Sequence, residues 1–214
     1  MAKSISTEVR GQTLTLYGRK ALYWHEKKTL ILADTHWGKA EAFQEHGIPI
    51  PSTVLDSDLD ELKAIVDEAG AERILVLGDL LHNSKPLSLA LHNQIAAWRE
   101  RCPVPILSIR GNHDARAEDF PEHWRIAWHA EPYIEGPFCF RHEPKSTKGL
   151  YTFCGHVHPV MNIGRPRMRL PCFWLSSKVG ILPSFGTFTG GFAVKPSLKD
   201  AVFLVSNGDI YPLH

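Results

Sequence analysis

The tetrapeptide Gly111-Asn112-His113-Asp114 directly follows an apolar run over residues 104–109. Such a run is typical of a buried strand, so the polar residues stand where that strand ends. Asn112 offers a neutral oxygen ligand, and His113 offers an imidazole that titrates near neutral pH. Asp114 is placed to orient that imidazole through a hydrogen bond. The tetrapeptide therefore predicts chemistry at the carboxyl end of a strand.

The same layout, an apolar run followed by ligand-type residues, occurs three more times. The runs over residues 29–33, 73–77 and 150–154 lead into Asp34-Thr35-His36, Gly78-Asp79 and Gly155-His156-Val157-His158. In open α/β sheets, ligands bind beyond the carboxyl ends of the strands. We therefore expect these side chains to meet at one edge of a sheet: Asp34, His36, Asp79, Asn112, His113, His156 and His158.

The first half of the chain alternates predicted strands and helices. An apolar stripe at helical spacing predicts a helix over residues 53–69, and a second helix is expected at about 87–101. Because these helices separate the strands at 29–33, 73–77 and 104–109, the strands should pair in parallel with helices packed on the sheet. The polar segment 37–52 directly follows the ligand motif, so it either shapes the entrance for a substrate or is a connecting segment with a short helix.

The flanking regions read as β-structure. Within residues 1–28 the pattern predicts two strands, at 13–17 and 21–24. After residue 115 the pattern has no clean period, and the expected strands lie at 125–129, 137–141, 150–154, 167–170, 172–175, 179–182 and 201–205. With no linker or internal repeat, residues 1–214 are expected to form a single domain of the α/β class, α+β in part.

Composition excludes several classes of protein. The 214 residues are 43% hydrophobic and 22% charged, as in ordinary globular proteins, and the net charge of +1 provides no global field for nucleic acid or membrane. The four cysteines form no CxxC pair, so a thiolate zinc site is not expected. The N-terminus has no apolar signal region, and no run reaches membrane-spanning length. We expect a cytoplasmic protein without a membrane partner; the sequence does not indicate an oligomeric state.

The four motifs together resemble those of the calcineurin-like metallophosphoesterases. The resemblance spans residues 29 to 158 and implies a β-sandwich of mixed sheets flanked by helices, with a metal site at the carboxyl ends of strands. Further segments resemble one bacterial branch, the ligase-associated DNA damage response endonucleases. They are residues 34–39, 47–51, 78–82, 170–174 and 183–191.

The resemblance implies two divalent ions, manganese before iron or zinc. Asp34, His36 and His158 would hold one ion, Asn112, His142 and His156 the other, and Asp79 would bridge both. His142 lies in no tight motif; it ends an apolar strand between the third and fourth motifs. His123 and His129 are its rivals.

The charges of such a site suit a phosphodiester. Two divalent ions carry four positive charges, which Asp34, Asp79 and a bridging hydroxide reduce to about one. The hydroxide would attack phosphorus, and His113 would protonate the leaving oxygen or stabilise its charge. Asp79, His113 and Asp114 are the expected catalytic residues. Many relatives have Gly-Asp-x-x-Asp, whereas His82 takes the last position here. The role of that aspartate in supporting the metal ligands would pass to His82 or Asn83, or be absent.

Four basic residues are candidates for substrate binding. Arg165, Arg167 and Arg169 alternate, so an extended chain would place them on one face along a nucleic-acid backbone; the alternative is a sheet edge guarded by charge. Lys39 is placed to reach a substrate phosphate, or is simply solvated. Trp37 and Trp174 are candidates for stacking on bases, with core packing the default for Trp174.

Three functions are compatible with these residues. The first is a metallophosphoesterase that acts on DNA as an endonuclease in repair, with a DNA ligase and a helicase as partners implied by the resemblance. The second is a small-molecule phosphodiesterase or phosphatase with the same metal site. The third is a non-catalytic repair scaffold, which the presence of Asp79, Asn112 and His113 disfavours.

Overall fold

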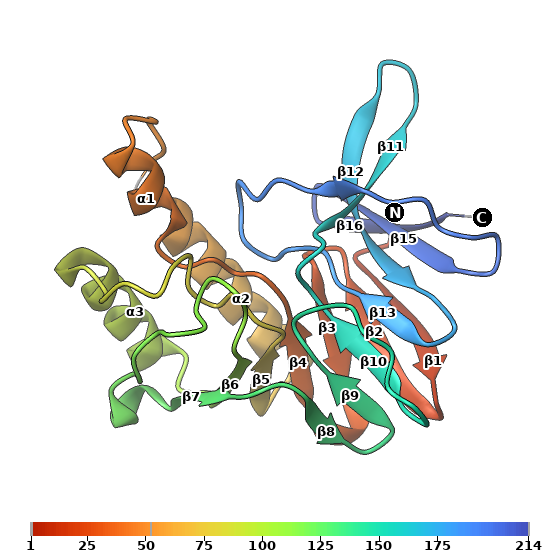
Figure 1. The fold of residues 1–214 in the computed structure, drawn as a ribbon, viewed down its shortest axis with the longest axis horizontal. Coiled ribbons are helices and arrows are strands. Elements are labelled where there is room, and N and C mark those ends of the chain that lie inside the picture. Colours follow the sequence, from red (N-terminus) through yellow and green to blue (C-terminus); the bar gives the residue numbers. More distant parts are fainter. Residues whose placement is uncertain (1, 52, 214) are drawn as a thin grey trace.

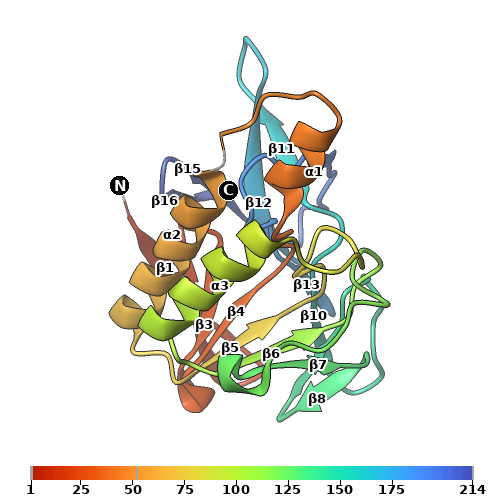
Figure 2. The same ribbon diagram turned by 90° about the vertical axis from the view of Figure 1, so that its left-hand side faces the viewer.

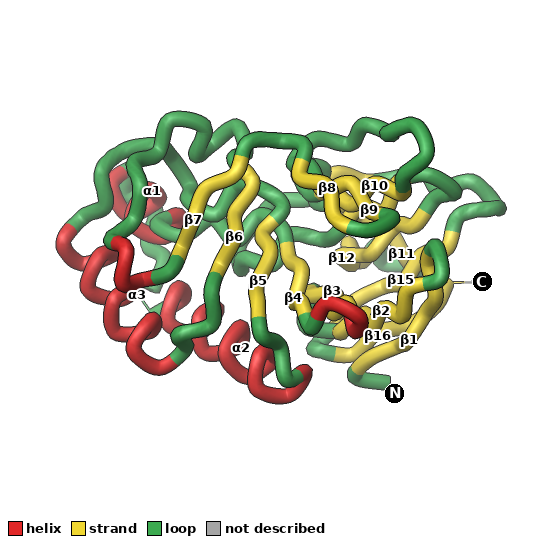
Figure 3. The backbone as a smooth tube through the Cα atoms, turned by 90° about the horizontal axis from the view of Figure 1, so that it is seen from below, coloured by secondary structure: helices red, strands yellow, loops and turns green. Residues whose placement is uncertain are grey.

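The computed structural model, which describes residues 2–51 and 53–213, stacks helices, a first sheet and a second sheet (Figures 1 and 2). The first sheet has seven strands in chain order, which lie side by side in Figure 3. They are β1 (Ser4–Val9), β2 (Gln12–Tyr17), β3 (Ala21–Trp24), β4 (Thr29–Leu32), β5 (Arg73–Val76), β6 (Ile106–Ile109) and β7 (Ile126–His129). Strands β1 to β4 pair antiparallel, and β4 to β7 pair in parallel.

The second sheet comes from the C-terminal half of the chain. Its strands are β8 (Tyr133–Glu135), β9 (Phe138–Phe140), β10 (Tyr151–Cys154), β11 (Pro159–Ile163), β12 (Met168–Leu175), β13 (Val179–Ile181), β14 (Phe192–Ala193), β15 (Ala201–Ser206) and β16 (Asp209–Leu213). The order is β14-β11-β12-β13-β10-β9-β8, and β15 pairs with β12 and β16. Parallel and antiparallel pairs occur in both sheets, so the expected sandwich of mixed sheets is confirmed.

The helices are α1 (Lys39–Glu45), α2 (Val54–Ala69) and α3 (Leu89–Arg101), with short 3₁₀ turns η1 (His25–Lys27) and η2 (Glu122–Trp124). Helices α2 and α3 cover the face of the first sheet that points away from the second sheet (Figures 1 and 3). None of the helices within the described ranges is long and apolar enough to span a membrane.

The apolar strands of the first sheet contribute side chains to two hydrophobic cores, because successive side chains point to opposite faces of the sheet. In β4, Leu30 and Leu32 pack against the helices, whereas Ile31 packs between the sheets. Strand β5 repeats the pattern with Ile74 and Val76 on the helix side and Leu75 between the sheets. Burial on both faces explains why these strands appear in the sequence as continuous apolar runs.

The expected helices and the parallel order of β4, β5 and β6 are confirmed. The expectation of two strands before residue 28 is wrong, because β1 precedes them as an edge strand. Its residues Ser4–Val9 are alternately exposed and half-buried, a weak apolar signal. Strand β12 runs unbroken through Pro171, where two strands were expected. Strands β8, β11, β14 and β16 are short or lie at edges, and no clear pattern predicts them.

An ion pair joins the two sheets at the end opposite the motifs. The guanidinium of Arg73 in β5 lies 2.7 Å from Glu135 in β8 and also donates to Thr29 and to the hydroxyl of Tyr133. Burial raises the pKa of Glu135, but the hydrogen bonds from Arg73 and Tyr133 and the positive charges outweigh it. The pKa therefore lies below its ordinary 4.5.

We expect Arg73→Met to lower the free energy of unfolding by about 1–2 kcal/mol at pH 7. Since the pKa of Glu135 is depressed in the folded state, this stabilisation is present above pH 4.5 and is lost as the pH falls through the folded pKa. Urea unfolding of both proteins between pH 7.5 and pH 4 should show the difference narrowing at the acid end. A difference that stays constant would contradict this account.

Candidate metal centre

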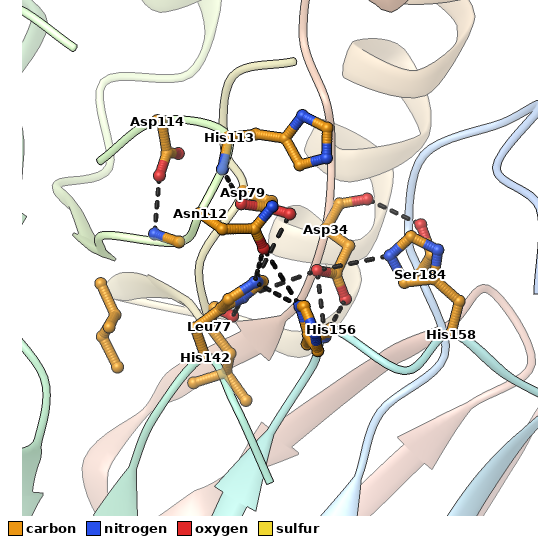
Figure 4. A network of polar contacts seen from close by, with 12 residues as sticks. Asp34, Leu77, Asp79, Asn112, His113, Asp114, His142, His156, His158 and Ser184 are labelled. Carbon is orange, nitrogen blue, oxygen red and sulfur yellow. Dashed lines mark hydrogen bonds and ion pairs between the residues drawn. The ribbon is translucent and has the colours of Figure 1, made fainter. Parts of the chain in front are cut away.

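Seven ligand-type side chains converge where the two sheets meet, and Figure 4 labels all of them except His36. We use the name metal centre for this set of candidate metal ligands: Asp34, His36, Asp79, Asn112, His142, His156 and His158. Asp34, Asp79 and Asn112 follow β4, β5 and β6 of the first sheet, whereas His142 and His156 follow β9 and β10 of the second. The motifs therefore do not gather at the edge of one sheet, as expected, but across the carboxyl ends of two.

The side chains form two adjoining groups. Ligand atoms of Asp34, His36 and His158 lie within 4.8 Å of one another, and so do those of Asp34, Asp79 and His142. Beside them, Asn112 Oδ1 lies 2.9 Å from His142 Nε2 and 3.1 Å from His156 Nδ1. His142 Nε2 is also 3.5 Å from Asp79 Oδ2. Asp79 thus stands beside the Asn112 group, and Asp34 beside both His142 and His158.

The polar contacts of these residues fit divalent cations. The Nδ1–H of His142 donates to the carbonyl oxygen of Leu77 at 3.0 Å. In the neutral imidazole, Nε2 therefore carries a lone pair, and it faces Asn112 Oδ1, which only accepts. A divalent cation held by both atoms would satisfy these two lone pairs. Among the described residues, the buried Nδ1 atom of His36 also lacks a hydrogen-bond partner. A donor set of imidazole, carboxylate and amide oxygen without thiolate suits manganese, iron or zinc.

The backbone at these positions is strained. Asp34, His36, Asp79, His156 and His158 have φ values of 55°, 49°, 51°, 67° and 48°. This left-handed region is uncommon for residues other than glycine and costs of the order of 1–3 kcal/mol each. Such strain persists only where the surrounding structure holds it, and it concentrates at functional sites. The five residues share a conformation that aims successive side chains into one small volume.

Hydrogen bonds between loops hold this conformation. Asp34 N donates to Gly78 O at 3.1 Å, and His36 N donates to Asp79 O at 3.0 Å. The Ser184 hydroxyl donates to Asp34 O at 2.7 Å. The carboxylate of Asp34 accepts from His156 N, at 3.0 Å to Oδ2. The loops after β4, β5 and β10 and the segment at residue 184 are therefore connected through Asp34.

Two glycines allow the backbone to approach the ligands. A Cβ atom built on Gly111 would lie well inside 3.0 Å of Asp79 Oδ1, and one built on Gly155 well inside 3.0 Å of Asp34 Oδ2, distances that real Cβ atoms essentially never show. Because the carboxylates occupy that space, these motif positions exclude any larger residue.

We expect Gly111→Ala to displace the carboxylate of Asp79 and to lower metal affinity by about 10- to 100-fold. Isothermal titration with manganese measures this directly. Gly190→Ala is the matched control, because a Cβ atom there meets nothing within 4 Å. Equal affinities of the two variants would show that Gly111 is not needed for the approach.

Burial and neighbouring charges shift the pKa values of two histidines of the centre in opposite directions. Burial, and then the positive charge of Lys39, lowers the pKa of His36 to about 2, so its imidazole keeps a lone pair at physiological pH. Burial lowers the pKa of His158 as well, but the carboxylate of Asp34 outweighs it and leaves the pKa above 6.5. Burial also lowers the pKa of Lys39, with Asp34 opposing.

His113 lies beside the metal centre with its ring exposed to solvent. The Nδ1–H of His113 donates to His82 O at 2.7 Å, which leaves Nε2 free. The rings of His113 and His82 stack at 5.3 Å. His113 N donates to Asp79 Oδ1 at 3.0 Å, so the residue is tied to the centre through its backbone. His36, His82 and His113 also form a group whose ligand atoms lie within 4.8 Å of one another.

The expected partnership between Asp114 and the imidazole of His113 is wrong, because the His82 carbonyl holds that position. The carboxylate of Asp114 accepts instead from Gly111 N at 2.6 Å and Leu81 N at 3.2 Å (Figure 4). Asp114 is fully buried and joins the loops after β5 and β6. It is a positioning residue and does not touch the exposed ring.

The other histidines considered for the seventh ligand lie elsewhere. His123 is exposed in η2, and the ring of His129 contacts Ala130 O and Tyr133. The structure brings only His142 of the three to the centre. No short motif marks His142 in the sequence. Its place at the centre results from the pairing of β9 with β10.

The basic residues are placed differently from one another. Arg165 and Arg167 lie in the turn over residues 164–167, and only Arg169 lies in a strand, so the three do not share the expected extended chain. The turn caps the projecting β11–β12 hairpin (Figure 1), and Arg169 donates to Gly191 O. Lys39 begins α1, three residues after His36.

Of the two tryptophans considered for stacking on bases, Trp37 is only 3% exposed and packs against Trp98. The expectation that Trp37 meets a base is therefore wrong. Trp174 is half-buried, and its indole N–H donates to Asp200. Sequence reasoning also missed Ser184, which carries no ligand signal and contributes only a hydroxyl to the backbone of Asp34.

Comparisons with known proteins agree with this geometry. The family model described as calcineurin-like phosphoesterase matches residues 27–178. The crystal structure of Pseudomonas putida nuclease MPE aligns with a TM-score of 0.86 and 35% identity, over 98% of this chain and 100% of that one. The structure of Yfce, a phosphoesterase from E. coli, covers 84% of this chain and 88% of that one, but its TM-score of 0.42 and 14% identity carry no argument. No curated protein matches the chain.

Proposed function

The chain belongs to the calcineurin-like phosphoesterase family and is a phosphodiester hydrolase, and from this premise we propose that it is a DNA nuclease that requires two divalent ions. The observation that carries the proposal is the whole-length likeness to a nuclease at 35% identity, combined with two adjoining ligand groups across the ends of two sheets. Manganese is the ion we propose.

The first proposed ligand set is one of these groups, and the second combines His142 of the other group with Asn112 and His156 beside it. Asp34, His36 and His158 hold one ion, and Asn112, His142 and His156 hold the other, with Asp79 between them. Bound ions would neutralise charge on the phosphate and lower the pKa of water toward about 7. Asp34 and Asp79 bring two negative charges, so the occupied site stays positive and attracts the phosphodiester anion.

In this proposal, residues around the centre position His113 as the proton donor and provide positive charge for the substrate. Asp114 and the backbone of Gly111 keep the loop after β6 in place, and the His82 carbonyl fixes the Nδ1–H tautomer of His113. When His113 is protonated, its Nε2–H can donate to the leaving oxygen of the sugar. Lys39 at the start of α1 adds positive charge on one side of the centre. Arg165, Arg167 and Arg169, all exposed, offer contacts to a longer strand on the hairpin side.

The test is turnover of single-stranded DNA, nicked DNA and a chromogenic aryl phosphodiester. After chelation of divalent ions we expect no turnover. Addition of manganese should then restore hydrolysis of both DNA and the aryl ester. Hydrolysis of the aryl ester without any cleavage of DNA would contradict the nuclease assignment and favour a small-molecule phosphodiesterase. A role in DNA repair beside a ligase and a helicase belongs to the same proposal, and co-purification with those enzymes tests it.

A further inference from the structure

A cavity of about 160 Å³ opens beside the metal centre. Thr35 and His36 line its inner end, and the walls come from α1, the first turns of α2 and α3, and the loop at residues 187–188. The walls are mainly apolar, with Phe43, Leu91 and Phe188 among them. The cavity is smaller than the roughly 300–1,000 Å³ of pockets that enclose drug-sized ligands, so it suits a single ring system.

Aromatic rings flank this cavity. Phe43 in α1 is half-buried, and its ring lies nearly parallel to that of His82 at 6.4 Å. The ammonium group of Lys39 sits 5.7 Å from the centroid of the Phe43 ring. A planar ligand in the cavity would therefore lie beside the Phe43 side chain, with the positive charge of Lys39 close to it.

Phe188 presents a second ring at the cost of strain. Its side chain is 58% exposed and its φ is 59°, a conformation that is a genuine outlier for a bulky residue. Packing in the core does not explain an exposed phenyl group held in this way. Its neighbour Thr187 is anchored to α2, since Thr187 N donates to Asp58 Oδ2 at 2.9 Å and its hydroxyl contacts the same carboxylate. The loop thus holds the ring at the rim of the cavity.

The neighbourhood of the cavity indicates its ligand. Under the proposed function, the scissile phosphate binds at the metal centre, so a group attached to the nucleotide beside it reaches His36 and Lys39 first. That group is either a sugar or a base, and only a base is a flat ring that stacks on phenylalanine. A base in a duplex is already stacked and paired, and turning it out costs a few kcal/mol.

We propose that this cavity binds the nucleobase adjacent to the scissile phosphate, with Phe188 and Phe43 as its stacking surfaces, and that it selects unpaired nucleotides. The inference rests on the proposed nuclease function. It assigns a nucleic-acid contact to the α1 side of the metal centre, separate from the arginines of the β11–β12 hairpin.

The experiment compares a short single-stranded DNA with the same strand in which the nucleotides flanking one phosphate carry tetrahydrofuran in place of the base. We expect the wild-type protein with manganese to cleave the base-bearing strand at that phosphate with a kcat/KM about 5- to 100-fold higher. Phe188→Ala should bring this ratio close to one, and Phe188→Trp should retain it.

Phe192→Ala is the matched control, because Phe192 is also an exposed phenylalanine, at 69%, but does not line the cavity. Its ratio should equal that of the wild type, and thermal melting verifies that each variant is folded. If the wild type cleaves both strands equally, or if Phe188→Ala keeps the ratio, the base site is wrong while the nuclease stands. If neither strand is cleaved although the aryl ester is hydrolysed, the nuclease proposal fails, and the base site fails with it.

Discussion

Replacing Asp79 with alanine is expected to lower kcat/KM for phosphodiester hydrolysis by about 10³-fold or more, because in the proposed site both ions would lose a ligand. Asp79 is 2% exposed, its Oδ2 lies 3.5 Å from His142 Nε2, and it forms one ligand group with Asp34 and His142. Charge stabilisation by a metal is worth several kcal/mol, and about 1.4 kcal/mol corresponds to a factor of ten in rate. Manganese titration should show weakened binding of both ions.

Asp79→Asn separates the charge of this residue from its shape. The amide keeps one oxygen ligand and the packing against Gly111, so we expect it to retain more metal than the alanine variant but far less activity than the wild type. Two manganese ions bound to Asp79→Ala with wild-type affinity would rule out the bridging position.

Replacing His113 with alanine should reduce cleavage of DNA by about 10²- to 10⁴-fold, the usual contribution of a general acid. The loss should be much smaller on a p-nitrophenyl diester, because a phenolate leaves readily without a proton. Both ions should remain bound, since His113 lies outside the two proposed ligand sets. Paired kinetics on the two substrates, with metal analysis of the same samples, measure all three expectations.

His129→Ala is the control for this variant, as that ring lies away from the metal centre against Tyr133. Equal losses on DNA and on the p-nitrophenyl diester would argue against proton transfer by His113. Loss of metal from the variant would assign His113 to the ligands, together with His36 and His82, with which it forms a third group.

Much of the site is predictable from sequence because its ligands directly follow strands. Asp34, Asp79, Asn112 and His156 stand one to three residues after apolar runs that are buried on both faces, and local pattern alone marks such positions. The helices over 54–69 and 89–101 are predicted for a similar reason, since each buries one apolar stripe.

What the sequence could not show depends on contacts between distant segments. His142 reaches the metal centre through the pairing of β9 with β10, which belong to a second sheet whose order no run of apolar residues encodes. The hydrogen bond that the Nδ1–H of His113 donates to His82 O joins two loops, and His82 O takes the position expected for Asp114. The alternation of arginines suggested an extended chain, but the backbone turns there over residues 164–167.

The position of the Phe188 ring could not be predicted from the sequence either. Its position depends on the anchoring of Thr187 by Asp58, 129 residues away in the chain. A loop residue without periodicity gives no signal of this kind. The same holds for Ser184, whose hydroxyl supports Asp34 from 150 residues away.

The central claim is that one cluster of side chains holds two metal ions side by side. Crystals soaked in manganese and measured for anomalous scattering test it most directly. We predict two peaks, one among Asp34, His36 and His158 and the other among Asn112, His142 and His156, with the carboxylate of Asp79 in contact with both. A single peak, or peaks outside these residues, would contradict the two-ion site.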